Sequence, residues 1–443
     1  KEDAEEKAKE DAEEKAIADK KAKEDAEEKA IADKKAKEDA EEKAIADKKA
    51  KEDAEEKAIA DKKAKEDAEE DNEPLDDKKQ LALNKVILGY WHNWQSSAAP
   101  YIPLKDVSPN YNIIAVSFAE PLRVHVDNTM NFKPAIQTEE SFKSDVATLQ
   151  ASGRKVIISL GGEKGSVTLT NEIEKNKFIT SMIKIIETYK FDGLDIDLEG
   201  SSLSLDTGDT DFKNPVSAKI VNLIDAIKQI KKHFGKDFIM TSAPETAYVQ
   251  GAASAYGGPW GAYLPVLFAL KDDLNYLQVQ LYNSGSMVAL DGKAYSKGTA
   301  DFIVSMTEML LRGFQTRSSA GFFPAFREEQ ILIGLPATPG AAYNNGSYIA
   351  PEEVLKALDY LTKGKTFAGQ TYNLQEPAGY SNISGMMTWS INWDKSTDGN
   401  TASNEFADTY SEYFDIHNAN KQVPEDKQVP EDKQVPEDKQ VPE

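Results

Sequence analysis

The central part of this sequence predicts an α/β fold, a single barrel of eight parallel strands with helices around it. Apolar, β-branched-rich runs of strand length recur between Leu81 and Asn420, as is typical of buried parallel strands. Between them lie segments with apolar residues at three- and four-residue steps, which favour helices. The interval of 340 residues suits one (β/α)8, or TIM, barrel.

The expected elements follow in chain order. Eight strand-length runs cover residues 86–91, 112–118, 155–160, 191–198, 238–243, 275–282, 331–335 and 384–389. Helical patterns fill gaps at residues 173–189, 217–234, 300–312 and 351–362. Pro351, followed by two glutamates, is a helix-start signal. We therefore expect a catalytic barrel over residues 81–420, with its active site at the carboxyl ends of the strands.

Both ends of the chain are simple repeats. Residues 9–64 hold four copies of KEDAEEKAIADKKA, which is rich in strong helix formers with acidic-first i,i+4 pairs. We expect a charged, helical spacer over residues 1–80. A weak coiled coil and disorder are the alternatives. Residues 421–443 repeat KQVPED, and the regular prolines predict an extended or disordered tail.

Composition narrows the classes of function. Of the net charge of -23, the two repeats carry -11 and -3, so the barrel keeps -9. An acidic barrel without basic clusters argues against nucleic acid and anionic membranes as partners. There is no cysteine, and the four histidines are scattered, so no thiolate chemistry or histidine-based metal site is expected. No apolar run reaches ~18 residues, so no membrane insertion is expected.

Residues 192–199 read DGLDIDLE and carry the main chemical signal. Side chains alternate along a strand, so Asp195, Asp197 and Glu199 point together into the barrel. Crowded, partly buried carboxyls raise at least one pKa, as a general acid requires. Glu199, nearest the mouth, is the expected acid. The alternatives are an ordinary strand with solvated acids, and a magnesium or calcium site built from the three acids.

DGLDIDLE closely resembles the DxxDxDxE signature of glycoside hydrolase family 18, the chitinases and endo-β-N-acetylglucosaminidases. Five more segments resemble this family in the right order over about residues 84–415. They are GYWHNW at 89–94, SLGG at 159–162, APE at 243–245, QLYN at 280–283 and Trp389.

The resemblance implies substrate-assisted catalysis, in which the substrate's own 2-acetamido oxygen attacks the anomeric carbon. It implies that Glu199 protonates the glycosidic oxygen and that Asp197 orients the acetamide. Asp195 would exchange a proton or hydrogen bond with Asp197, and Tyr282 would donate to the acetamide oxygen. Trp389 would form the floor beneath the sugar. Other candidates for substrate binding, by ring stacking or cleft lining, are Gln280, Asn283, Met240, Tyr90, Trp94 and Trp260. No cofactor or metal is implied.

Some members of the family insert an α+β domain between strands seven and eight. Residues 336–383 leave little room for it, so we expect an open cleft and endo-acting cleavage. The resemblance thus predicts a secreted, monomeric chitinase acting on chitin or N-acetylglucosamine oligosaccharides, with spacer ends compatible with cell-surface association. The alternatives are an endo-β-N-acetylglucosaminidase on N-glycans, disfavoured by the first, fifth and sixth strand segments, and a non-catalytic chitin-binding lectin, disfavoured by the three acids.

Overall fold

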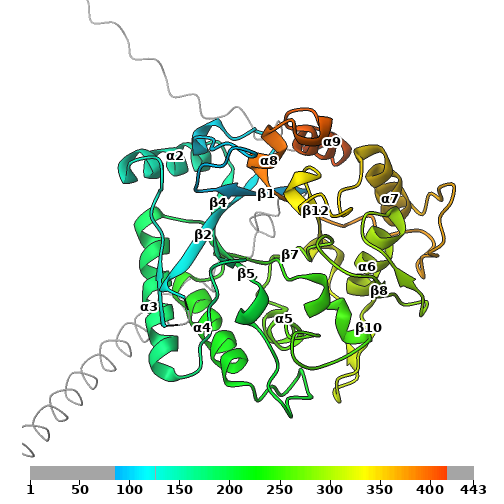
Figure 1. Cartoon of the computed structure of the whole chain (residues 1–443), viewed down its shortest axis with the longest axis horizontal. Coiled ribbons are helices and arrows are strands. Elements are labelled where there is room, and N and C mark those ends of the chain that lie inside the picture. The colour runs from blue at the N-terminus through cyan, green and yellow to red at the C-terminus, as the bar shows by residue number, and fades with distance from the viewer. Residues whose placement is uncertain (1–84, 125, 417–443) are drawn as a thin grey trace, which may run out of the picture. The chain divides into compact units, whose positions relative to one another are not determined.

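The structure of the protein, a computed structural model, describes residues 85–124 and 126–416 (Figure 1). All of them belong to one compact unit, Leu83–Glu443. The helical spacer predicted for residues 1–80 and the extended tail predicted for residues 421–443 lie outside the described residues. Along the described stretch of chain, none of the helices is both long enough and apolar enough to cross a membrane.

Eight parallel strands form the barrel (Figure 1). In spatial order they are β12 (Leu332–Pro336), β13 (Gly385–Trp389), β1 (Val86–His92), β2 (Ile113–Arg123), β4 (Lys155–Gly162), β5 (Gly193–Leu198), β6 (Ile239–Ser242) and β7 (Tyr276–Leu277). Parallel bridges from Leu277 to Ile331 and from Gln280 to Gly334 join the last strand to the first. The ring is therefore nearly closed, and the predicted (β/α)8 TIM barrel is confirmed.

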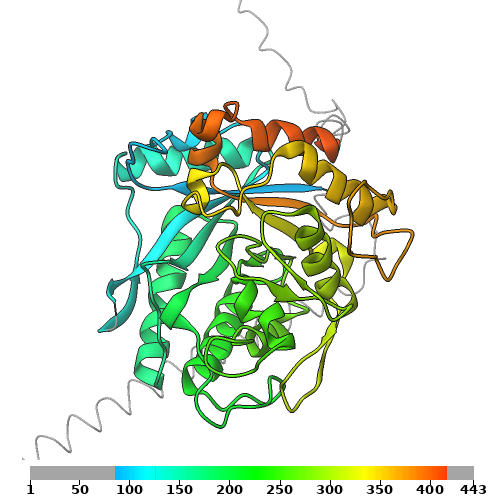
Figure 2. The same cartoon turned by 45° about the vertical axis from the view of Figure 1, so that its right-hand side comes forward.

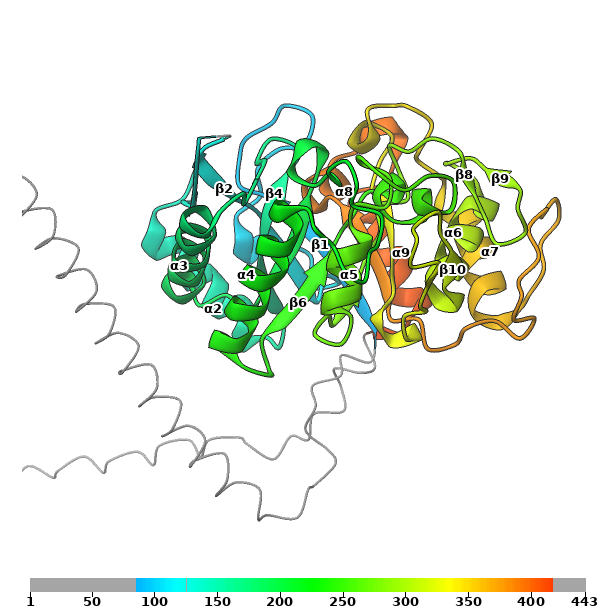
Figure 3. The same ribbon diagram turned by 90° about the horizontal axis from the view of Figure 1, so that it is seen from below.

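Helices surround the sheet, and Figure 3 shows α3, α4 and α5 side by side in this layer. The helices are α2 (Glu139–Ala151), α3 (Glu172–Tyr189), α4 (Ala218–Phe234), α5 (Leu264–Leu270), α6 (Ala300–Arg312), α7 (Pro351–Lys363), α8 (Ile391–Lys395) and α9 (Glu405–Tyr413). The four predicted helices agree with α3, α4, α6 and α7 to within a residue at either end. Helices α2, α5, α8 and α9 were not predicted. For α2 the sequence held a signal, because Thr138 caps its first turn by accepting from the Ser141 backbone N–H.

Small sheets and 3-10 turns complete the loops. The hairpins are β8 (Met287–Val288) with β9 (Ala294–Tyr295), and β10 (Phe314–Gln315) with β11 (Phe322–Phe323). Between β12 and β13 the chain forms the 3-10 turn Gly340–Ala342 and helix α7, with no strand. The barrel therefore has no α+β insertion at this point, as predicted.

Alternation along the strands separates two cores. Leu194, Ile196 and Leu198 of β5 belong to the large core that the sheet shares with helix side chains. A smaller apolar cluster, which includes Leu88 and Met387, fills the inside of the barrel. Because β-strand side chains alternate, the acidic residues of β5 point into this interior. Apolar packing below them leaves their carboxyls at the carboxyl-terminal end, where a barrel carries its active site.

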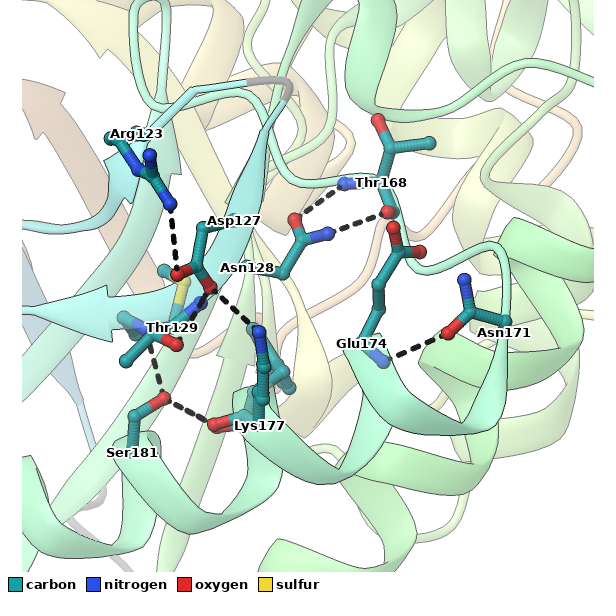
Figure 4. A network of polar contacts seen from close by, with 11 residues as sticks. Arg123, Asp127, Asn128, Thr129, Thr168, Asn171, Glu174, Lys177 and Ser181 are labelled. Atoms are coloured by element: carbon teal, nitrogen blue, oxygen red, sulfur yellow. Dashed lines mark hydrogen bonds and ion pairs between the residues drawn. The ribbon is translucent and has the colours of Figure 1, made fainter. Parts of the chain in front are cut away.

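A hairpin extends one side of the barrel rim, where β2 pairs antiparallel with β3 (Asp127–Asn131). Its cyan strands are visible at the left of Figure 2. Figure 4 shows how polar contacts hold it against α3. Asn128 donates to the Thr168 carbonyl at 2.9 Å and accepts from the Thr168 N–H at 3.2 Å. The Asp127 carboxylate lies 3.7 Å from Lys177 Nζ on α3. These contacts hold the hairpin close to its turn, at the start of β3.

Candidate active site

Asp195 lies at the centre of the barrel and is fully buried. Its Oδ2 accepts from Tyr90 Oη and Ser159 Oγ, each at 2.7 Å. Its Oδ1 accepts from Thr241 Oγ1 at 2.5 Å and from Gln278 Nε2 at 2.9 Å. These donors come from β1, β4, β6 and the segment that follows β7. Donors from four different parts of the barrel therefore fix the Asp195 carboxyl at the barrel axis.

Asp197 and Glu199 follow towards the mouth, on the face that alternation predicted. Gln280 Nε2 donates to Asp197 Oδ1 at 3.0 Å and to Glu199 Oε1 at 2.9 Å. The two carboxyls also share a hydrogen bond. At the end of β5, the Leu198 N–H donates to Tyr263 Oη at 2.8 Å. The three acids therefore form one line that rises from the barrel interior to its opening.

Burial determines how these acids ionise. It raises the pKa of Glu199 to about 7, the Glu245 and Glu163 charges adding to this while hydrogen bonds from Gln280 and Asp197 oppose it. The pKa of Asp197 lies well above its usual value through burial and then the Glu199 charge. Burial also raises the pKa of Asp195, although its four donors oppose this. Near neutral pH, Glu199 therefore holds its proton for much of the time, as a general acid requires.

The acids open into a cleft of about 660 Å³. Eight of the residues predicted for the site line this cleft together: Glu199, Asp197, Tyr282, Trp389, Gln280, Asn283, Tyr90 and Trp94. They come from the ends of four barrel strands, β1, β5, β7 and β13, and the segments that follow them. Asp195 lies beneath the lining and contacts it through Tyr90.

One wall of the cleft is aromatic. Trp389 lies 5.9 Å from Phe118, with the two rings nearly parallel, and 4.7 Å from the His92 ring. Trp94 stacks on His92 at 4.4 Å. Burial lowers the pKa of His92 to about 3, so this imidazole is neutral. The wall therefore presents uncharged ring faces opposite the carboxyls, which suits a ligand with one apolar and one hydroxylated face.

Tyr282 and Asn283 border the cleft beyond Gln280. Burial, with the charges of the nearby carboxyls, raises the pKa of Tyr282 well above its usual value. Its phenol is therefore protonated and can donate. The Asn283 N–H donates to Ser347 Oγ at 2.9 Å, and its side chain accepts from Asn345 Nδ2 at 2.7 Å. Asn283 thus joins the segment after β7 to the loop after β12.

Comparison with known proteins agrees with this geometry. Residues 86–289 match the model of glycosyl hydrolases family 18. The chain is 44% identical to a probable class II chitinase of Arthroderma benhamiae over 306 residues, 66% of this chain and 90% of that protein. The chain belongs to glycoside hydrolase family 18.

Further similarities extend this family assignment. The chain is 54% identical to Chitinase D of Niallia circulans over 316 residues, 71% of this chain. It spans only 59% of the length of that relative. A crystal structure of a family GH18 chitinase from Chromobacterium violaceum has a TM-score of 0.65 at 35% identity, covering 74% of this chain and 83% of the other.

Two residues predicted to bind substrate lie elsewhere in this family 18 barrel. Met240 is buried in the outer core and is the register partner of Leu194, so alternation turns it towards the helices. The structure corrects the prediction that it lines the cleft. Trp260 is 38% exposed, lies against Gly251 and is not among the cleft-lining residues. Its predicted role in sugar binding, outside this part of the cleft, stays a prediction.

Several residues that line the cleft were not predicted: His92, Phe118, Glu120, Glu163 and Tyr343. Glu163 directly follows Gly162 at the end of the third barrel strand, so its position was a usable signal. Phe118 had none, because the β2–β4 register shifts between Ser117 and Ala119. Within residues 85–124 and 126–416, no cluster of three or more His, Asp or Glu side chains is arranged to hold a metal ion.

Proposed function

We propose that this chain is a chitinase that hydrolyses β-1,4 bonds between N-acetylglucosamine units. The observation that carries the proposal is Glu199, a buried acid with a pKa of about 7, in a cleft whose other wall is aromatic. Membership of family 18 supports it, and the relatives named above are all called chitinases.

In the proposed mechanism, Glu199 gives its proton to the glycosidic oxygen as the bond to the anomeric carbon breaks. The acetamide oxygen of the same sugar attacks that carbon and forms a cyclic oxazolinium ion. Glu199, now a carboxylate, takes a proton from a water molecule. The water oxygen attacks the anomeric carbon and opens the oxazolinium ring. Two inversions at one carbon give net retention, so the product is the β-anomer.

The neighbouring residues hold the reacting acetamide. Asp197 orients the acetamide N–H and stabilises the positive charge of the oxazolinium ion, while protonated Tyr282 donates to the acetamide oxygen. Gln280 contacts both Asp197 and Glu199 and therefore keeps the two carboxyls in line. Asp195, with four donors, exchanges a proton or hydrogen bond with Asp197.

Trp389 carries the sugar at the cleavage site. It is partly exposed to the cleft and packs on Phe118 and His92, so its ring has a fixed orientation. The apolar face of a pyranose stacks on such a ring, while its hydroxyls face the polar wall. Gln280, Asn283, Tyr90 and Trp94 are proposed to contact sugar units in the same cleft.

We also propose that cleavage is endo-acting, because no inserted domain walls the cleft between β12 and β13. Chitin is an insoluble polymer, so an enzyme that degrades it works outside the cell, and we propose a secreted monomer. The proposed spacers on either side of the barrel would suit a cell-surface enzyme.

A substrate comparison tests the proposal against its rivals. The wild-type chain is given a fluorogenic chitotrioside and, separately, a high-mannose glycoprotein. We expect hydrolysis of the chitotrioside and an intact glycoprotein. Release of the N-glycan with an intact chitotrioside would assign an endo-β-N-acetylglucosaminidase instead, and binding of chitin without hydrolysis would assign a lectin.

A further inference from the structure

A hydrogen bond crosses the mouth of the cleft. Tyr343 Oη donates to Glu163 Oε2 at 3.1 Å, and both side chains line the cleft. Glu163 follows β4, whereas Tyr343 follows β12. In the ring of eight strands, three strands separate β4 from β12 on either side. The contact therefore joins loops from opposite sides of the barrel.

The bridge lies above the candidate acid. Tyr343 is 69% exposed and Glu163 is also exposed, whereas Asp197 is buried. Both bridge residues therefore lie at the outer opening of the cleft, and Glu199 lies between them and the barrel interior. A linear polymer bound along the cleft against Trp389 would have the bridge over it.

The backbone beneath Tyr343 is held firmly. The Tyr343 and Asn344 N–H groups donate to Gly340 and Pro339 carbonyls at 3.0 and 2.9 Å. The Gly340 N–H donates to Asp398 Oδ2 at 2.6 Å. Both Tyr343 and Asn344 have positive φ, 55° and 53°, a conformation that non-glycine residues keep only where the surroundings impose it.

The phenol ring, in contrast, is the movable part. Among the described residues, its hydroxyl has one hydrogen-bond partner, Glu163. A single hydrogen bond to a carboxyl group favours the closed position by on the order of ten- to a hundredfold. Rotation of an exposed side chain is also fast compared with turnover. Closed and open positions are therefore both accessible without moving the loop.

We propose that Tyr343 and Glu163 form a side-chain bridge that determines how a polysaccharide enters the cleft. With the bridge closed, a chain end threads beneath it; with the ring turned away, an internal stretch enters from the side. The proposal rests on the proposed chitinase function and makes Tyr343 and Glu163 determinants of endo against end-wise attack.

Locking the bridge tests this directly. The chain has no cysteine, so a Tyr343→Cys/Glu163→Cys variant carries the only two thiols. A flexible bis-methanethiosulfonate links them, and reductant releases them. The linked and released forms of one preparation are compared on a fluorogenic chitotrioside and on glycol chitin, where loss of viscosity reports internal cleavage.

We expect linking to slow the loss of viscosity by at least about tenfold. Chitotrioside hydrolysis should change by less than about threefold, because the link restricts entry of a polymer and leaves the chemical step unchanged. Release by reductant should restore the viscosity rate. Equal slowing on both substrates, or no slowing with complete linkage by mass spectrometry, overturns the proposal. A wild-type chain inactive on chitotrioside would instead refute the chitinase function.

Two single variants give an independent measurement. Tyr343→Ala removes the bridge, whereas Tyr343→Phe keeps the ring and removes only its hydrogen bond. We expect viscosity lost per bond cleaved to rise by about two- to fivefold in Tyr343→Ala, with Tyr343→Phe between this and wild type. An unchanged ratio in Tyr343→Ala contradicts the bridge.

Discussion

Asp195 and Glu163 are carboxyls of the same site with very different surroundings. Asp195 is fully buried and accepts four hydrogen bonds, three from strand residues and one from Gln278, directly after β7. Glu163 is exposed and accepts a hydrogen bond from a tyrosine on an opposite loop. The strands thus hold the groups proposed for chemistry, where small displacements are costly. The loops hold the groups proposed for access, which must move.

The largest effect on activity is expected for the Glu199→Gln variant, which removes the proton donor and keeps its shape. We expect kcat/KM on the chitotrioside to fall by about 10²–10⁴-fold or more. Glu245→Gln is the matched control, because Glu245 lines the same cleft and burial also raises its pKa. Equal losses of kcat/KM in the two variants would show that Glu199 does not act as the general acid.

Stability distinguishes the barrel centre from the bridge. Asp195→Ala leaves four buried donors without an acceptor, and we expect the free energy of unfolding to fall by about 2–4 kcal/mol. Tyr343→Phe alters an exposed contact and should change it by less than about 0.5 kcal/mol. Urea unfolding of both variants beside wild type measures this. Similar values for the two would contradict the contrast.

The pH dependence of activity tests whether Glu199 is the general acid and whether the Glu245 charge affects its pKa. Glu199 must be protonated to act, so kcat/KM should fall as pH rises through its pKa of about 7. In Glu245→Gln, loss of a neighbouring negative charge makes ionisation of Glu199 easier. The pKa therefore drops, and the alkaline limb of the profile should move to lower pH. A limb that stays in place or moves upward would exclude this electrostatic coupling.

The smallest effect is expected from removing both repeats. A chain of residues 81–420 lacks both repeats and should keep its chitotrioside activity within about twofold, with an unchanged thermal midpoint, since the repeats are proposed to be spacers outside the catalytic barrel. Loss of folding or of activity would show that the repeats belong to the catalytic unit and are not spacers.

Strand alternation explains what the sequence could predict. It correctly oriented Asp195 and Asp197, because DGLDIDLE alternates without interruption along β5. The same rule applied to the next strand would have excluded Met240. Thr241 is the register partner of Asp195 and faces inward, so Met240 faces the helices. The wrong prediction for Met240 could therefore have been avoided from the alternation of residues 240 and 241 in the sequence.

Other features depend on contacts between distant residues. Phe118 reaches the cleft beyond a register shift between β2 and β4, which no local pattern indicates. The partners Tyr343 and Glu163 are 180 positions apart, and only closure of the barrel brings their loops together. Residues on strands were therefore predictable from periodicity, whereas pairs of loop residues required the three-dimensional structure.

The central claim is that Glu199 and the substrate's acetamide together break the bond, without an enzyme nucleophile. The most direct measurement compares two fluorogenic chitobiosides that differ only at the cleaved unit, one with its N-acetyl group and one with a free amine. We predict rapid hydrolysis of the first, to a β-anomer, and almost none of the second. Comparable rates for the two, or an α-anomer as first product, would contradict it.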